Sequence, residues 1–226
     1  MCGRTSLFVP RERVEARFDA TAVEPLEPRY NVAPRDDLAV VRDDAPDAIH
    51  LDEWGLVPDW TDDPSADRFI NARAETVEEK PSFADAVAER RCLVLADGFY
   101  EWQDRTTGSQ PYRVQRADGE PFAMAGVYER HDGDPTVAVL TTEPNAVVEP
   151  LHHRMAVVLP PGREREWLRA DDPDDRAALL TTPDPDPWER YPVTDRVGDP
   201  SYDDPELVEP VDAPDEDPQT GLGDFA

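Results

Sequence analysis

The second residue of the chain, Cys2, could carry chemistry that an internal cysteine cannot. Removal of Met1, which is usual before a small side chain, would leave Cys2 with a free α-amine beside its thiol. The amine can condense with an aldehyde, and the thiol can then close on the imine to give a five-membered thiazolidine ring. An α-amine titrates at about 8 and a thiol at about 8.5, so both have a nucleophilic fraction at neutral pH. The alternative is an incidental residue of a frayed terminus.

An asparagine and an arginine stand two residues apart at the end of a short strand expected over Phe69–Ala72. The amide of Asn71 both donates and accepts hydrogen bonds, so it can hold a sugar or carbonyl oxygen. Side chains two residues apart lie on the same face of an extended chain, and the Arg73 guanidinium suits a phosphate. The alternative is a turn-capping asparagine beside a surface arginine.

A carboxylate lies among aromatic residues in the run Gly98-Phe99-Tyr100-Glu101-Trp102. Apolar surroundings raise the pKa of a glutamate towards neutrality, which is what a general acid or base requires at neutral pH. Glu101 is therefore a candidate proton-transfer group. The alternative is a strand end at which the carboxylate faces solvent.

Two adjacent histidines precede an arginine in the run His152-His153-Arg154-Met155. An imidazole titrates close to neutral pH and can move a proton, and the alternative is one core and one surface histidine. A zinc site that combines these histidines with the two cysteines has no supporting ligand spacing. We therefore expect no metal and no other cofactor.

The run Trp54-Gly55-Leu56-Val57-Pro58 is apolar and holds both glycine and proline, which predicts a loop. Apolar and aromatic side chains can insert between nucleic-acid bases or stack on them, and this contribution survives high salt. The run is therefore a candidate apolar wedge, and the alternative is a loop packed into the core.

These residues need a scaffold, and the hydrophobic pattern predicts a mainly β protein with short helices. Helical patterns cover residues 11–18, 81–90, 164–170 and 174–180. Strand patterns cover residues 38–42, 49–54, 69–72, 91–96, 112–115, 122–128, 136–141 and 156–159, and 30–34 is expected to be a loop. The many non-sequential strands indicate one α+β domain around a mainly antiparallel, barrel-like sheet. We place this domain at residues 2–198 and expect the acidic, proline-rich residues 199–226 to be largely a tail.

The composition is strongly acidic, with a formal net charge of -28 over 226 residues and a sequence pI of about 4.3. Lys80 is the only lysine, and pairs of aspartates recur along the chain. Such a surface suits a cytosol of very high salt and indicates a halophile, with an acidic mesophile as the alternative. Two cysteines make no disulfide framework, and neither a membrane span nor a signal peptide is visible, so we expect a cytoplasmic protein.

Taken together, the motifs resemble those of the SRAP family, the SOS response-associated peptidase or abasic-site processing proteins, and the composition suggests a haloarchaeal member. The resemblance spans about residues 2 to 195, nearly all of the expected domain. The matching blocks follow the family's order and are Met1-Cys2-Gly3-Arg4, Tyr30-Asn31-Val32-Ala33-Pro34, Trp54-Gly55-Leu56-Val57-Pro58, Asn71-Ala72-Arg73-Ala74-Glu75, Arg91-Cys92-Leu93, Asp97-Gly98-Phe99-Tyr100-Glu101-Trp102, His152-x-Arg154-Met155 and Tyr191-Pro192-Val193.

The resemblance implies a protein that recognises abasic sites in single-stranded DNA. It would bond to them covalently through its N-terminal cysteine, as a thiazolidine that shields the lesion in the DNA damage response. The implied catalytic residues are Cys2 as nucleophile, Asn71 to orient the amine and opened sugar, Glu101 to move protons, and His152 to protonate the ring oxygen. The implied DNA contacts are Arg4, Asn31, Trp54, Leu56, Pro58, Arg73 and Arg154. We also expect a monomer, and an associated peptidase or lyase activity.

Two positions depart from the family's pattern. Ala156 stands where a proline usually follows the His-x-Arg-Met run, which could loosen the entry to that strand. His153 adjoins His152, so the choice of the working histidine rests on its alignment to the following arginine. The resemblance also requires the three arginines assigned to phosphates to converge in one concave patch on an otherwise acidic surface.

Two other functions remain open at this point. An N-terminal-nucleophile glutamine amidotransferase also begins Met-Cys-Gly, but it would need an Asn-Gly oxyanion element, and the chain has no Asn-Gly pair. A non-catalytic single-strand-binding module is the second alternative. It predicts that Cys2 is dispensable and that undamaged DNA binds as well as damaged DNA.

Overall fold

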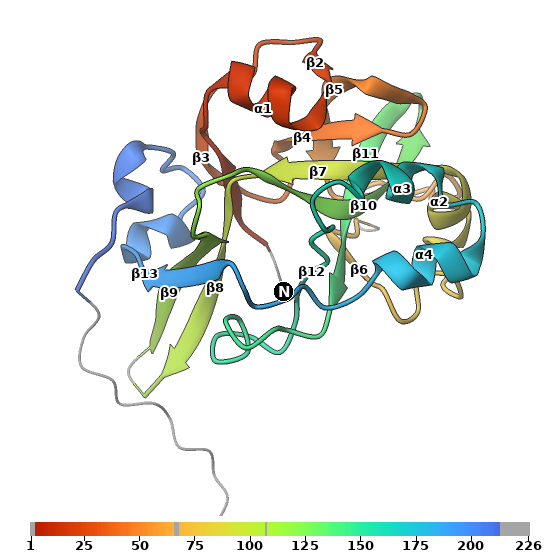
Figure 1. The fold of residues 1–226 in the computed structure, drawn as a ribbon. Coiled ribbons are helices and arrows are strands. Elements are labelled where there is room, and N and C mark those ends of the chain that lie inside the picture. The colour runs from red at the N-terminus through yellow and green to blue at the C-terminus, as the bar shows by residue number, and fades with distance from the viewer. Residues whose placement is uncertain (1–2, 66–67, 107, 213–226) are drawn as a thin grey trace, which may run out of the picture.

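The computed structural model describes residues 3–65, 68–106 and 108–212, in which strands outnumber helices (Figure 1). The strands are β1 Thr5–Leu7, β2 Thr21–Ala22, β3 Arg29–Val32, β4 Asp37–Arg42, β5 Ala45–Trp54, β6 Asn71–Arg73, β7 Arg91–Ala96, β8 Gly98–Arg105, β9 Gly108–Arg116, β10 Phe122–His131, β11 Asp134–Thr142, β12 Met155–Ala156 and β13 Trp188–Pro192. The helices are α1 Arg11–Phe18, α2 Ala84–Glu89, α3 Glu164–Arg169 and α4 Pro173–Leu179, with 3-10 turns η1 Asp195–Gly198 and η2 Pro205–Val208.

Five strands close into a small barrel in the order β5-β4-β7-β10-β11. Four of the five contacts around the ring are antiparallel, and the parallel pairing of β11 with β5 closes it. Closure leaves these strands without an open edge along the paired stretch. The predicted α+β class with a mainly antiparallel, barrel-like core is confirmed.

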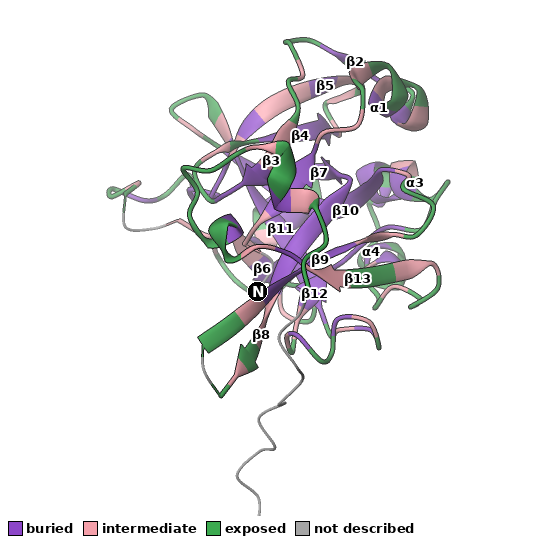
Figure 2. Cartoon of the chain, turned by 90° about the vertical axis from the view of Figure 1, so that its left-hand side faces the viewer, coloured by how far each residue is buried: buried purple, intermediate pink, exposed green. Residues whose placement is uncertain are grey.

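The barrel strands alternate between two apolar environments, as a period of two requires. In β7, Cys92, Val94 and Ala96 belong to the cluster that includes Trp54, whereas the intervening leucines belong to the cluster that includes the buried faces of the helices. Both faces of β7 are therefore covered, which explains why its residues 92–96 are all apolar. Figure 2 shows the buried strands at the centre and the exposed residues mainly on loops and on helix faces.

A second sheet, with the order β13-β9-β8-β1-β3, stands beside the barrel. The chain passes from the barrel strand β7 directly into β8, which forms a hairpin with β9 (Figure 1). The short strand β1 pairs antiparallel with β8, with Thr5 opposite Phe99 and Ser6 opposite Gly98. Strand β1 is thus tied to the strand that carries Glu101.

Sequence patterns located most elements but misplaced some of them. The predicted helix over 81–90 is shorter, because α2 covers only Ala84–Glu89. The expected loop at residues 30–34 is wrong for its first half, since Tyr30–Val32 belong to β3, which pairs with β1. Backbone pairing with a distant strand overrides the local extended-loop signal there.

Residues 199–212 pack onto the second sheet. Leu207 of η2 is fully buried in a cluster with Tyr100, Val193 and Val197. The later part of the expected tail, from residue 213, lies outside the described residues. Within the part of the chain that the structure covers, no helix has the length and apolar character needed to cross a membrane.

Candidate functional site

Glu101 lies in the middle of β8, and its surroundings are apolar enough to change its ionisation. It is only 2% exposed, opposite Tyr112 of the neighbouring strand β9. Burial disfavours the ionised carboxylate and raises the pKa of Glu101 to about 7. At neutral pH the side chain therefore exists in both forms, as a general acid or base requires.

This raised pKa predicts a pH-dependent cost in stability. The folded-state pKa lies above the unfolded value, so Glu101 costs nothing below the unfolded pKa and destabilises the fold as pH rises through the folded pKa. Replacing Glu101 with glutamine should therefore stabilise the protein at pH 8 relative to pH 4, by up to about 3 kcal/mol, the equivalent of a pKa shift from 4.5 to about 7. Denaturant unfolding at both pH values measures this, and a pH-independent difference would contradict it.

Asn71 and Arg73 begin and end β6, which lies parallel to β11. The residue between them, Ala72, is buried, so alternation puts Asn71 and Arg73 on the other side of the strand, as predicted. Arg73 is exposed, and within the described residues no carboxylate lies within ion-pair distance of it. Its guanidinium is available to a ligand.

Arg154 is brought to the same place through Thr141 of β11. The register sets Thr141 opposite Arg73, and the Thr141 carbonyl oxygen accepts a hydrogen bond of 2.6 Å from Arg154. The Arg154 guanidinium also forms two parallel hydrogen bonds with the Glu75 carboxylate, at 2.7 and 2.9 Å. The two arginines therefore flank one strand end, and a carboxylate already occupies the fork of one of them.

His152 lies in the loop between β11 and β12, which an asparagine organises. The Asn145 side-chain oxygen accepts hydrogen bonds from the backbone N–H groups of Val147 and Val148, and the Val148 carbonyl accepts from the His152 N–H. The His152 ring nitrogen Nδ1 lies 3.0 Å from the Arg154 backbone N–H, which can donate to it. This contact engages Nδ1 and orients the ring.

The environment of His152 also favours its neutral form. Partial burial is the main cause of its lowered pKa, and the neighbouring His153 ring adds to the effect. The two rings stack, with centroids 4.3 Å apart. His152 is therefore mostly uncharged at neutral pH and able to accept a proton.

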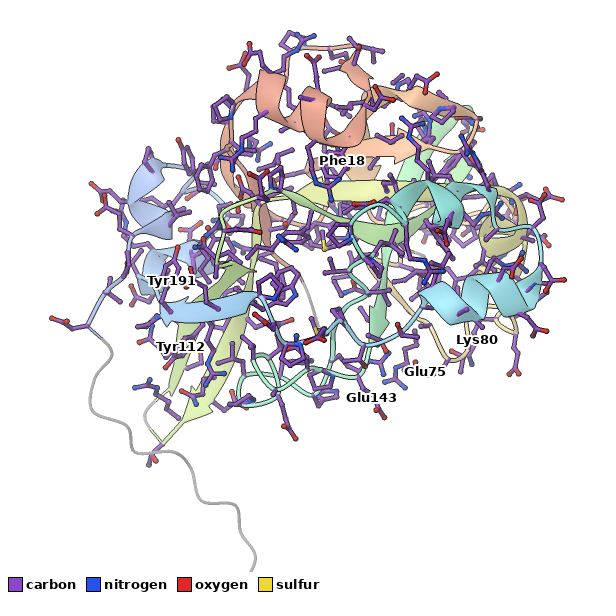
Figure 3. All side chains as sticks on the ribbon, in the orientation of Figure 1. Phe18, Glu75, Lys80, Tyr112, Glu143 and Tyr191 are labelled. Atoms are coloured by element: carbon purple, nitrogen blue, oxygen red, sulfur yellow. The ribbon has the colours of Figure 1, made fainter. Side chains whose placement is uncertain are left out.

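A hollow of about 790 Å³ joins the His152 loop to the far end of β8. Asp104 of β8 lines it together with Glu143, Glu149 and the two histidines. Figure 1 shows this loop below the barrel, beside the β8–β9 hairpin, and Figure 3 shows Glu143 and Glu75 on the same lower side of the molecule. Three of the eight residues that line the hollow are carboxylates and none of these eight is an arginine, so its rim is acidic.

Arg4 and Asn31, two of the residues expected to contact DNA, bond to each other and to the segment around η1. Arg4 donates to the side-chain oxygen of Asn31 at 2.9 Å and to the carbonyl oxygens of Val197 and Gly198. Asn31 is fully buried and donates to the carbonyl of Tyr202. The Arg4 side chain thus points to η1, and the structure brings together two of the three expected phosphate-binding arginines, not all three.

The apolar run expected to form a wedge is mostly internal. Trp54 ends β5 with its side chain inside the barrel, where its indole N–H donates to the Ile70 carbonyl at 2.8 Å. Leu56 is also fully buried, so neither side chain presents a surface to a base in this conformation. Pro58 is buried as well. The exposed residues begin at Asp59, and Trp60, which was not among the candidates, is 56% exposed. The exposed part of this segment therefore begins later than the motif suggests.

Of the two cysteines, Cys92 lies within the described residues and Cys2 does not. Cys92 lies inside the barrel, fully buried, and burial raises its pKa well above the ordinary value, so it is inert as a nucleophile. Cys2 lies outside the described residues. The β1–β8 register, continued by two residues from Thr5, places Gly3 opposite Glu101, and Gly3 is the residue that follows Cys2.

The fold and motif order agree with a known family. Residues 1–200 match the family described as SOS response associated peptidase (SRAP), and the chain belongs to this family. The predicted resemblance is confirmed.

Named relatives share nearly the whole chain. The abasic site processing protein YoqW of Bacillus subtilis (strain 168) is 37% identical over 222 residues, which cover 92% of this chain and 99% of that protein. The abasic site processing protein YedK of Escherichia coli (strain K12) is 31% identical, covering 93% of this chain and 100% of its own length. A crystal structure of a protein from Bacteroides thetaiotaomicron superposes with a TM-score of 0.85 at 26% identity, covering 93% of this chain and 100% of that one.

Proposed function

We propose that this protein processes abasic sites in single-stranded DNA by forming a thiazolidine crosslink through Cys2 once Met1 has been removed. Support comes from the names of the relatives, which are abasic site processing proteins. The observation that carries the proposal is the buried Glu101, with its pKa raised to about 7, in register with the start of the chain. A proton-transfer group beside an N-terminal aminothiol suits imine chemistry on an aldehyde.

The reaction balances with the groups of the chain alone. The sugar of an abasic site opens to an aldehyde at C1′, and the Cys2 amine adds to this carbon. Protonated Glu101 gives a proton to the departing hydroxyl, water leaves, and an imine forms. The Cys2 thiolate then attacks the imine carbon, and the nitrogen takes a proton, which gives the thiazolidine. One aldehyde and one aminothiol are consumed, and one water is released.

His152 would assist the opening of the sugar ring, and Asn71 would bind the opened sugar. A neutral His152 can accept the proton of the C1′ hydroxyl and deliver one to the ring oxygen, so that the closed sugar becomes the aldehyde. The amide of Asn71 offers a donor and an acceptor to the amine and the opened sugar. Both residues come from segments adjacent to β11, Asn71 from β6 and His152 from the loop that follows.

The DNA strand is held by phosphate contacts and by stacking. Arg73, opposite Thr141 in the strand register, and Arg154, bonded to the Thr141 carbonyl, supply the cationic contacts. The exposed indole of Trp60 offers a surface on which a base can stack, which tolerates any sequence. Arg4 contributes by anchoring the N-terminal strand, so its own phosphate contact would require release from Asn31 and η1.

Replacing Glu75 with glutamine is expected to strengthen binding of undamaged single-stranded DNA by about fivefold. The change keeps hydrogen bonds to Arg154 but removes a charge that competes with phosphate, and a unit charge at roughly 4 Å is worth about 1 kcal/mol in water. Glu79→Gln removes the same charge from an exposed site nearby and should change affinity less. Weaker binding by the Glu75 variant in a fluorescence titration would show that Glu75 instead holds Arg154 in place.

The proposal is tested by incubating untagged protein, shown to lack Met1, with an oligonucleotide that holds one abasic site. A denaturing gel should show a heat-stable shifted band that depends on the lesion. The same oligonucleotide without the lesion should give none. A folded, processed protein that produces no band would refute the covalent function.

A further inference from the structure

A buried carboxylate ties the beginning of the chain to the second sheet. Asp97, the residue between β7 and β8, accepts a hydrogen bond of 2.6 Å from the Ser6 hydroxyl of β1. Its other oxygen accepts from the backbone N–H groups of Phe8, at 2.6 Å, and Val9, at 3.0 Å. One carboxylate therefore fixes both β1 and the turn that leads from it into α1.

A buried arginine completes this arrangement from a third strand. Arg113 of β9 is 1% exposed, and its guanidinium donates to the Ser6 hydroxyl at 2.6 Å and to the Asp97 carboxylate at 3.1 Å. The guanidinium lies directly against Gly98, where an added Cβ would sit 2.3 Å from its central carbon. A side chain at residue 98 would displace the guanidinium from Ser6 and Asp97.

The network of Ser6, Asp97 and Arg113 fixes the register of β1, which backbone pairing alone determines only weakly. The strand β1 has three residues, and its pairing with β3 on the other side is irregular between Thr5 and Leu7. A slip of one residue would send alternate side chains to the opposite face. Buried ion pairs add little net stability compared with apolar packing, and their better attested role is to fix a register. Asp97 and Arg113 can bond to the Ser6 hydroxyl in only one register of β1. They therefore disfavour registers that are shifted by one residue.

We propose that Asp97 and Arg113 are positioning residues that lock β1 against β8 and so set Gly3, to which Cys2 is joined, opposite Glu101. The inference rests on the proposed function and deepens it. Neither residue touches DNA or the reacting atoms. Each acts through Ser6, whose register sets Gly3, and with it the attachment point of Cys2, opposite Glu101.

The test compares Arg113→Met and Asp97→Asn with matched changes in another buried ion pair. Arg42 and Asp52 join β4 to β5 through contacts of 2.8 and 3.0 Å and serve as the control, as Arg42→Met and Asp52→Asn. At saturating abasic DNA, the two positioning variants should crosslink about 10²-fold more slowly, because a small misplacement of reacting groups is costly. The affinity of these variants for the same DNA should not change. The pH optimum of their crosslinking rate should not change either. The control variants should keep the wild-type rate.

A second readout does not depend on activity. Amide exchange at Thr5–Leu7 should accelerate in Arg113→Met but not in Arg42→Met, and Arg113→Lys should restore part of the protection. Wild-type crosslinking rates in folded positioning variants, or exchange that rises equally in variants and controls, would overturn the proposal. If the variants fail to fold, Gly98→Ala displaces the guanidinium while keeping both charges, and the same outcomes apply. Absence of crosslinking in the wild type would instead refute the proposed function, and the exchange result would still decide the lock.

Discussion

Replacement of Cys2 by alanine should abolish the covalent adduct and leave noncovalent binding of abasic DNA in place. Alanine keeps the α-amine, so an imine can still form, but nothing closes on it, and the imine hydrolyses. The contacts assigned to DNA binding, Arg73 and Arg154, belong to another part of the sheet and do not change. The denaturing gel should therefore lose its band, whereas a binding titration should not move.

A serine at position 2 distinguishes the role of the α-amine from that of the thiol. Cys2→Ser retains the amine and offers a hydroxyl, which is a far weaker nucleophile than a thiolate at neutral pH. Borohydride should trap the imine of either variant as a reduced, stable adduct, although neither yields a heat-stable band without it. A heat-stable band from the alanine variant would show that another group bonds to DNA. Cys92 is not a candidate, since it is fully buried.

Replacement of Glu101 by glutamine should slow crosslinking by about 10²–10⁴-fold, the usual contribution of a general acid or base. Glutamine has nearly the same shape but cannot donate the proton that the departing hydroxyl needs. DNA affinity should be unchanged, because the side chain is buried in β8. Glu129→Gln, which alters a buried glutamate of β10 paired with Arg90, is the matched control and should keep the wild-type rate.

The pH profile gives a sharper form of the same prediction. Glu101, with a pKa of about 7, loses its proton before the amine and thiol do, so the wild-type rate should be highest between about pH 7 and pH 8 and fall on either side. The glutamine variant should keep the rising limb and lose the falling one. An unchanged falling limb in the variant would assign that ionisation to a different group, such as His152.

The barrel could be predicted from the sequence because its strands obey simple patterns. Residues 92–96 are a continuous apolar run, and such a run indicates a strand covered on both faces, as β7 is. The helix at Arg11–Phe18 was predicted with the same bounds, since its buried Val14 and Phe18 are spaced four residues apart. Local periodicity is enough for elements of this kind.

Residues whose role depends on distant partners could not be placed in this way. The sequence predicts that Trp54 is part of an apolar wedge that contacts bases. In the structure, strand alternation directs its side chain into the barrel. Arg113 lies in a correctly predicted strand, yet no single-sequence signal shows that its guanidinium is buried against Asp97. Glu75 stands in the Asn71–Glu75 motif, but its pairing with Arg154 spans 79 residues of sequence. Such contacts follow from the assembled fold.

The alternatives named from the sequence predict different results in the crosslinking assay. A non-catalytic binding module would hold undamaged DNA as well as damaged DNA and would tolerate the loss of Cys2. An amidotransferase would release ammonia from glutamine in a reaction that depends on Cys2. Membership of the SRAP family and the names of the relatives favour neither.

The most direct test of the central claim is the mass of the adduct and the location of its bond. Untagged protein would be reacted with an abasic oligonucleotide, and the product would be measured intact and after proteolysis. The expected mass is that of the chain without Met1 plus that of the oligonucleotide, less one water, and the modification should lie on the N-terminal peptide at Cys2. An adduct at any other residue, or one formed with Met1 still attached, would contradict it.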